Sequence, residues 1–210
     1  MFYYKKLTSS EAKGRPAYEG NTLPPVAYDG FYIIEGLSNQ TVRLFYQPST
    51  PIAEYAVDNS FFSNTSSNEI LGVLNSDNSH KVFFKFRDGV TNIRWLFYGV
   101  PMKSIYFINS PRLESINSTF KNCTMLEEIN QINTHFCTDF TSAFEGCSSL
   151  LNAPRLDYTN ADLLNYTFKD CTSLQEAKDV NQQDIWLMNV NQHEKCFENV
   201  NNNKIFGTWR

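Results

Sequence analysis

The chain carries little charge and few residues that break regular structure. Of its 210 residues only 19% are charged, the net charge is −4, and there are 9 glycines and 8 prolines. This composition implies no electropositive surface of the kind that holds a phosphate backbone, so no nucleic-acid partner is expected. The 41% of apolar residues suffice for a packed core, which excludes collagen, coiled coil and wholesale disorder.

Long hydrophobic runs are also missing. No apolar stretch approaches the ~20 residues that cross a bilayer, so no membrane insertion is expected. The first ten residues lack the basic segment, the apolar run and the cleavage site of a secretory signal, and export through a cleaved signal is not expected either.

Cysteine and histidine are too few, and too scattered, for the usual reactive sites. The five cysteines are an odd number, which argues against a disulfide scaffold. The three histidines lie in different segments without a triad signature. His135 near Cys137, and His193 near Cys196, have spacings that suit a metal, but neither has a second ligand pair. We therefore expect no enzyme, no catalytic residue, no metal and no cofactor.

What the chain does contain is 23 asparagines and, in its second half, an internal repeat with a 24-residue period. The repeat reads Phe-x-x-Cys-x-x-Leu. Its three columns are Phe120, Phe144 and Phe168, then Cys123, Cys147 and Cys171, then Leu126, Leu150 and Leu174.

The period predicts a solenoid. It lies within the range of leucine-rich repeats, in which each turn supplies one short strand and one returning segment. Recurring positions then stack at about the 4.8 Å inter-strand distance, Phe on Phe and Cys on Cys. Upstream, Leu96 and Gly99 occupy the Phe and Cys positions, so the coil is expected to begin near residue 96.

The Phe-x-x-Cys-x-Ser/Thr-Leu signature, the filler rich in Asn and Thr and the period resemble the BspA-like leucine-rich repeat surface proteins over residues 96–200. The resemblance implies a coil that attaches to host or bacterial surfaces.

The first half lacks the repeat and predicts strands at 31–34, 41–46, 52–57, 69–74 and 81–87, with a polar loop at 61–67. Two hairpins are expected. Residues 36–40 would join the first two strands, and Asp88-Gly89 would turn the last strand into a partner at 91–97.

The expected fold is therefore mainly β, with a small antiparallel β domain followed by about four 24-residue leucine-rich turns and a C-terminal cap. The parts are an N-terminal arm (1–30), the β domain (31–95), the repeats (96–180) and a terminal repeat with cap (181–210). The aromatic residues expected to close the open end of the core are Trp186, Phe197, Phe206 and Trp209.

These features predict a non-enzymatic structural or recognition protein. Adhesin-like repeats without an export signal favour a phage virion component, such as a capsid-decorating, head-fibre or tail-attachment subunit, located in the virion. Its N-terminal half would dock on other subunits of the assembly. The alternative is a bacterial adhesin, extracellular or on the cell surface, that binds a host protein or glycan.

Exposed aromatic rings are the candidate binding residues, because Tyr offers a large rigid contact area at low entropic cost. In the coil these are Tyr98, Tyr106, Tyr158 and Tyr166. Acidic side chains on the polar side, among them Glu127, Glu128 and Asp157, are expected to be solvated, with a binding strip as the alternative.

Overall fold

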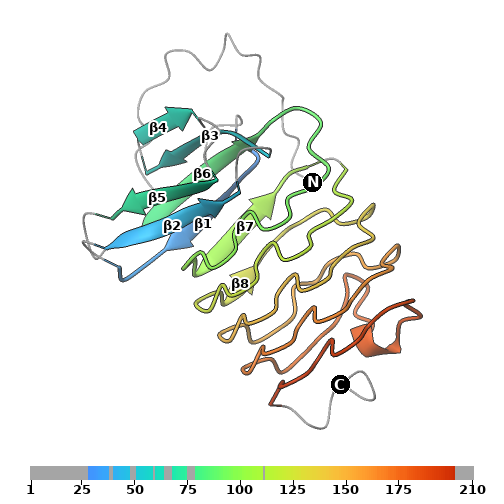
Figure 1. Cartoon of the computed structure of the whole chain (residues 1–210). Coiled ribbons are helices and arrows are strands. Elements are labelled where there is room, and N and C mark those ends of the chain that lie inside the picture. Colours follow the sequence, from blue (N-terminus) through green and yellow to red (C-terminus); the bar gives the residue numbers. More distant parts are fainter. Residues whose placement is uncertain are drawn as a thin grey trace.

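The computed structural model describes residues 28–201, except 38–39, 48–50, 59, 64–67, 75–78 and 111. Over this part the protein is mainly β, with two sheets, one short 3-10 helix and no closed barrel. Figure 1 shows the strands gathered at one end and a series of stacked turns at the other. Nearly all of the expected N-terminal arm (1–30), together with Phe206 and Trp209, lies outside the described residues.

The larger sheet has six strands in the order β4-β3-β6-β1-β7-β8. All neighbours are antiparallel except β7 and β8, which are parallel. The strands are β1 (Gly30–Ile34), β3 (Ile52–Val57), β4 (Ser60–Ser63), β6 (His80–Phe86), β7 (Ser104–Ile108) and β8 (Glu128–Ile129).

The smaller sheet consists of β2 (Thr41–Tyr46) and β5 (Glu69–Val73), and it packs on one face of the larger sheet. Phe45 of β2 meets Tyr32 of β1 edge-on at 5.9 Å between ring centroids, and its ring centroid also lies 5.9 Å from that of Phe97. The Tyr32 hydroxyl donates a 2.6 Å hydrogen bond to the Leu44 carbonyl, which satisfies a polar group that is wholly buried.

Both expected hairpins are wrong. β1 pairs with β6 and β7, whereas β2 pairs with β5. The physical reason is that β1 is apolar on both faces and takes an interior place in the sheet, whereas β2 has one half-exposed face. The Asp88-Gly89 turn exists, but residues 91–97 form no strand beside β6 and enter the stacked turns instead.

The remaining strand predictions for the first half are mostly confirmed. Strands occur at β1, β2, β3, β5 and β6 close to the expected bounds. The polar loop expected at 61–67 is wrong at its start, because Ser60–Ser63 pairs with β3 as strand β4. The two phenylalanines in this stretch fit a paired strand better than a solvated loop.

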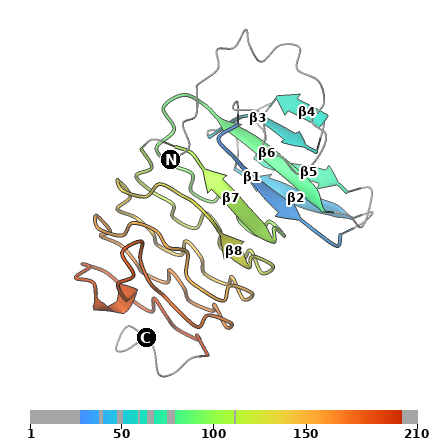
Figure 2. The same cartoon turned by 180° about the vertical axis from the view of Figure 1, so that it is seen from behind.

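Consecutive turns of the second half are joined side by side in parallel. One series of parallel bridges links Asn92, Ser115, Asp139, Leu163 and Gln192 in succession. We refer to residues 91–200 as the repeat stack, whose turns are seen one above another in Figures 1 and 2. Within it, backbone amides of alternate residues donate to the next turn, as from Phe120 to the Ala143 carbonyl at 2.9 Å.

A column of phenyl rings runs through the centre of the repeat stack. Successive rings of Phe97, Phe120, Phe144, Phe168 and Phe197 are nearly parallel, with centroids 5.5, 5.5, 5.3 and 5.4 Å apart. All five are buried. Phe97 in turn contacts Phe45 and Phe84, so the column continues into the core between the two sheets.

The register at the two ends of the repeat stack differs from the sequence-based alignment. Phe97, not Leu96, begins the ring column, and the first parallel bridge lies at Asn92. At the other end, Phe197 joins the column and Cys196 precedes it. The step from Phe168 to Phe197 is longer than the period because the last turn also accommodates the 3-10 helix η1 (Ile185–Leu187).

Each turn contains two residues in the left-handed region of backbone conformation. One column holds Trp95, Ser118, Ser142, Tyr166 and Lys195, and the other holds Gly99, Asn122, Gly146, Asp170 and Asn199, with φ between 51° and 76°. Asn, Asp and Gly tolerate this region best, which accounts for the small residue just before each Cys of the repeat.

The boundary expected at residue 95/96 does not separate two cores. A single buried cluster extends from Tyr32 to Val200. Strand β7 belongs to the repeat stack through its parallel partner β8 and to the antiparallel sheet through β1. The first half therefore continues the sheet of the second half.

Candidate recognition surface

The repeat columns singled out from the sequence lie in the core. Phe, Cys and Leu at all nine positions are at most 1% exposed. Each thiol of the Cys column donates to a Phe carbonyl of the previous turn: Cys123 to Phe97 at 2.9 Å, Cys147 to Phe120 at 3.1 Å and Cys171 to Phe144 at 3.0 Å. These side chains stabilise the stack and offer nothing to a ligand.

The cysteines are also poor nucleophiles. Burial raises the pKa of Cys123, Cys137 and Cys196 to about 12, and it raises the pKa of Cys147 and Cys171 as well. The thiolate is the reactive form, so these groups are unreactive at neutral pH. Among the described residues, no three His, Cys, Asp or Glu side chains gather as a metal site would require.

Of the four candidate tyrosines, Tyr158 is wrong as a binding residue. It is only 2% exposed, and burial raises its pKa well above 10. Its ring packs 4.8 Å from that of Phe140, and its hydroxyl has no hydrogen-bond partner within the described part of the chain. Burial removes the apolar surface of the ring from water, which is favourable, and the hydroxyl is buried together with the ring.

The other three tyrosines keep part of their surface. Tyr106 is 37% exposed and stacks on Phe31 with ring centroids 4.6 Å apart. Tyr166 is half-buried, with the Lys169 ammonium 5.7 Å from its ring centroid. The structure does not bring these rings together into one site, and a binding role for them stays a prediction.

Tyr98 belongs to a cluster that joins the small sheet to the first turn. The Arg43 guanidinium lies 5.1 Å from the Tyr46 ring centroid and 5.7 Å from that of Tyr98, and it donates to the Tyr98 carbonyl at 3.0 Å. Arg43 also pairs with Glu69 on β5. Because the rings contact one another and the guanidinium, this cluster mainly fastens elements together.

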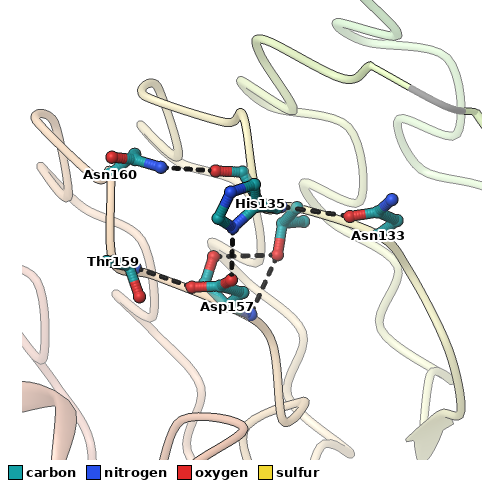
Figure 3. A network of polar contacts seen from close by, with 6 residues as sticks. Asn133, His135, Asp157, Thr159 and Asn160 are labelled. Carbon is teal, nitrogen blue, oxygen red and sulfur yellow. Dashed lines mark hydrogen bonds and ion pairs between the residues drawn. The ribbon is translucent and has the colours of Figure 1, made fainter.

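A second polar network lies on loops of two consecutive turns, 133–136 and 157–160 (Figure 3). His135 Nδ1 lies 2.9 Å from Asp157 Oδ2, and the two side chains are 55% and 27% exposed. The Asp157 amide donates to the Thr134 hydroxyl at 3.0 Å, and that hydroxyl donates to the Asp157 carbonyl at 2.9 Å. The Asn160 side chain donates to the His135 carbonyl at 2.7 Å.

The loop also exposes a large apolar side chain. Phe136 is 47% exposed, and its ring meets the His135 imidazole edge-on, at 4.9 Å and 76°. The Arg112 guanidinium of the previous turn lies 5.8 Å from the Phe136 ring centroid. An exposed phenyl ring beside an ordered polar network is the arrangement, within the described part of this chain, that most resembles a recognition site.

Sequence reasoning missed Phe136 and Arg112 because neither occupies a repeat column. It also missed why asparagine and aspartate are so frequent. Their side-chain oxygens accept from the amide two residues on, as at Asn92, Asn133, Asp139, Asp157 and Asp179. Such Asx turns recur at the corners of the stack, and an Asn or Asp two residues before each corner is the signal that predicts them.

The Asp157 network predicts a pH dependence of stability. Burial opposes ionisation of Asp157, but hydrogen bonds from Thr159 and His135 outweigh it and lower its pKa below 3.8. A carboxylate with a lowered folded pKa stabilises the protein at higher pH, and this contribution is lost as pH falls from about 4 through the folded pKa. Replacing Asp157 with Asn should therefore reduce the free energy of unfolding at pH 6 and flatten its decline below pH 4. Urea unfolding across this range measures both; an unchanged acid limb would contradict the assignment.

Comparisons of the chain with protein-family models, with curated proteins and with solved structures find no match. No helix within the described ranges combines the length and apolar character needed to span a membrane. The function is therefore inferred from the arrangement of residues.

Proposed function

We propose that the chain is a non-enzymatic recognition protein built on a short leucine-rich repeat solenoid similar to those of BspA-like surface proteins. The repeat stack supplies the scaffold, and the loops at its corners supply the contact surface. The antiparallel sheets extend the scaffold and provide the end through which the chain docks on other subunits.

The observation that carries this proposal is the continuous column of five stacked phenyl rings, Phe97 to Phe197. The Phe, Cys and Leu side chains that recur along it are buried, and the Cys thiols donate to carbonyl groups of neighbouring turns. The recurring core residues thus stabilise the stack, while side chains that differ from turn to turn lie on its surface. This division of labour is typical of solenoids that bind partners on an extended surface.

The setting that we propose is a phage virion, with the chain as a decorating, fibre or attachment subunit. This assignment depends on the resemblance to adhesin repeats and on the joined, two-part architecture. The alternative is an adhesin displayed on the producing cell.

Fractionation of a producing culture separates these settings. If the proposal is correct, the protein sediments with intact particles and remains with them through a density gradient. Recovery with the envelope of uninfected producing cells would instead support the adhesin. Recovery only as a free protein that binds neither particles nor cells would overturn the recognition function itself.

A further inference from the structure

The loops around Phe136 form one defined surface, which we call the Phe136 patch: Phe136, His135 and Asn133 from one turn, and Asp157 and Asn160 from the next. Figure 3 shows the polar members joined across the two turns. Three of the polar side chains are each held through one of their own atoms: Asn133 through Oδ1, Asn160 through Nδ2 and the imidazole through Nδ1.

Because one polar atom of each of these side chains is hydrogen-bonded, the second polar atom of the same side chain has a fixed orientation. The imidazole Nε2, the Asn133 Nδ2 and the Asn160 Oδ1 make no further contact among the residues that the structure describes, and all three residues are exposed. Asn133 thus offers a fixed donor and Asn160 a fixed acceptor, while Nε2 serves as either according to its tautomer. Side chains that are already ordered lose little entropy when a ligand binds.

The charges within the patch and beside it are nearly balanced. Asp157 pairs with His135, and Arg112 is accompanied by Glu114, whose carboxylate lies 3.4 Å from the Arg112 Nε. Among these described side chains no cation is left over to hold a phosphate or a carboxylate. The apolar part is small as well, because Phe136 is its single large apolar side chain, whereas a specific protein interface needs roughly 800 Å² on each partner.

We propose that the Phe136 patch binds a neutral carbohydrate, with one sugar ring lying on the Phe136 phenyl face and its hydroxyls on His135, Asn133 and Asn160. A pyranose combines an apolar C–H face with an edge of hydroxyls that both donate and accept, and the patch offers the complement of each. This inference rests on the recognition function proposed above and names its ligand class.

The test uses the full chain and soluble hexasaccharides of glucose, mannose, galactose and N-acetylglucosamine as probes. Binding is measured by saturation-transfer NMR and titration calorimetry. At least one probe should bind, with a Kd of about 1 mM or tighter. Phe136→Ala should weaken that binding by about tenfold or more, and His135→Ala by about fivefold. A hexasaccharide of galacturonic acid should bind more weakly than the neutral probe.

Leu151→Ala provides the matched control, because Leu151 is an apolar side chain of similar exposure, 48%, that lies outside the patch. It should leave binding unchanged, and Phe136→Ala and Leu151→Ala should unfold near the wild-type urea concentration, whereas His135→Ala, which also loses the hydrogen bond to Asp157, should unfold at a slightly lower one. The proposal is overturned if no neutral probe binds, or if binding survives Phe136→Ala. If the protein binds particles or cells and Phe136→Ala retains that binding, the carbohydrate site is wrong and the recognition function stands.

Discussion

Replacing Phe144 with alanine is expected to destabilise the protein by about 3–5 kcal/mol, the range for a buried phenylalanine. Phe144 is fully buried, and its ring lies between those of Phe120 and Phe168 at 5.5 and 5.3 Å. Its loss leaves a cavity that cannot close, because the turns above and below are held by backbone hydrogen bonds. Urea unfolding followed by tryptophan fluorescence measures the change.

Two further variants keep this prediction decisive. Phe144→Leu retains most of the volume and should cost about 1–2 kcal/mol, so that a folded variant is available if the alanine form does not fold. Phe136→Ala removes the same side chain from an exposed site and should stay within about 0.5 kcal/mol of wild type. Equal losses at positions 136 and 144 would mean that the ring column does not stabilise the fold.

The Gly146→Val variant is the second substitution with a large expected effect, about 3 kcal/mol of destabilisation. Gly146 has φ +76°, and a Cβ there would lie only 2.4 Å from Asn122 Oδ1 in the turn above. Rotating Asn122 away from this clash would lose the hydrogen bond that its Nδ2 donates to the Tyr98 hydroxyl at 3.2 Å. The substitution thus combines an unfavourable backbone conformation with a clash between turns.

Gly89 separates the two contributions. It has nearly the same φ, +73°, but a Cβ there would meet nothing within 4 Å. Gly89→Val should therefore show the conformational cost alone, about 1–2 kcal/mol. Adding Asn122→Ala to the Gly146→Val variant should recover part of the difference in unfolding free energy. If both valine variants lose the same stability, contact between the turns plays no part.

The sequence predicts the centre of the repeat stack better than its ends. Between Phe120 and Phe168 the spacing is regular, and stacking of like residues follows from the period alone. The first turn is shorter than the period and the last is longer, so a fixed period selects Leu96 in place of Phe97 and does not lead to Phe197. Differences in length between successive turns leave the ring column intact. The structure, unlike the period, shows which segments contain the extra or missing residues.

Strand pairing in the first half could not be read from local signals. Gly36 and Asp88-Gly89 are good turn residues, but a turn does not fix which strands pair after it. β1 finds both of its partners, β6 and β7, far downstream in the chain, because only an interior position buries both of its faces. Local propensity identifies such strands without assigning their neighbours.

The Phe136 patch was hidden for a related reason. Its members come from adjacent turns and include pairs one repeat period apart, Asn133 with Asp157 and Phe136 with Asn160, but the residue type at these positions differs from turn to turn. Periodicity draws attention to residues that recur, and these are the buried ones. Side chains that differ from turn to turn carry the exposed surface, and their meeting depends on the path of each corner.

Strand β7 has an additional consequence for how such a protein lengthens. One of its edges pairs with the antiparallel strand β1, whereas the other pairs in parallel with β8, and each later turn is joined in parallel to the turn before it. The geometry of the antiparallel half therefore does not depend on the number of turns in the repeat stack. Duplication of a repeat unit downstream would lengthen the repeat stack without changing the antiparallel half, so stacks of different length are compatible with the same antiparallel half.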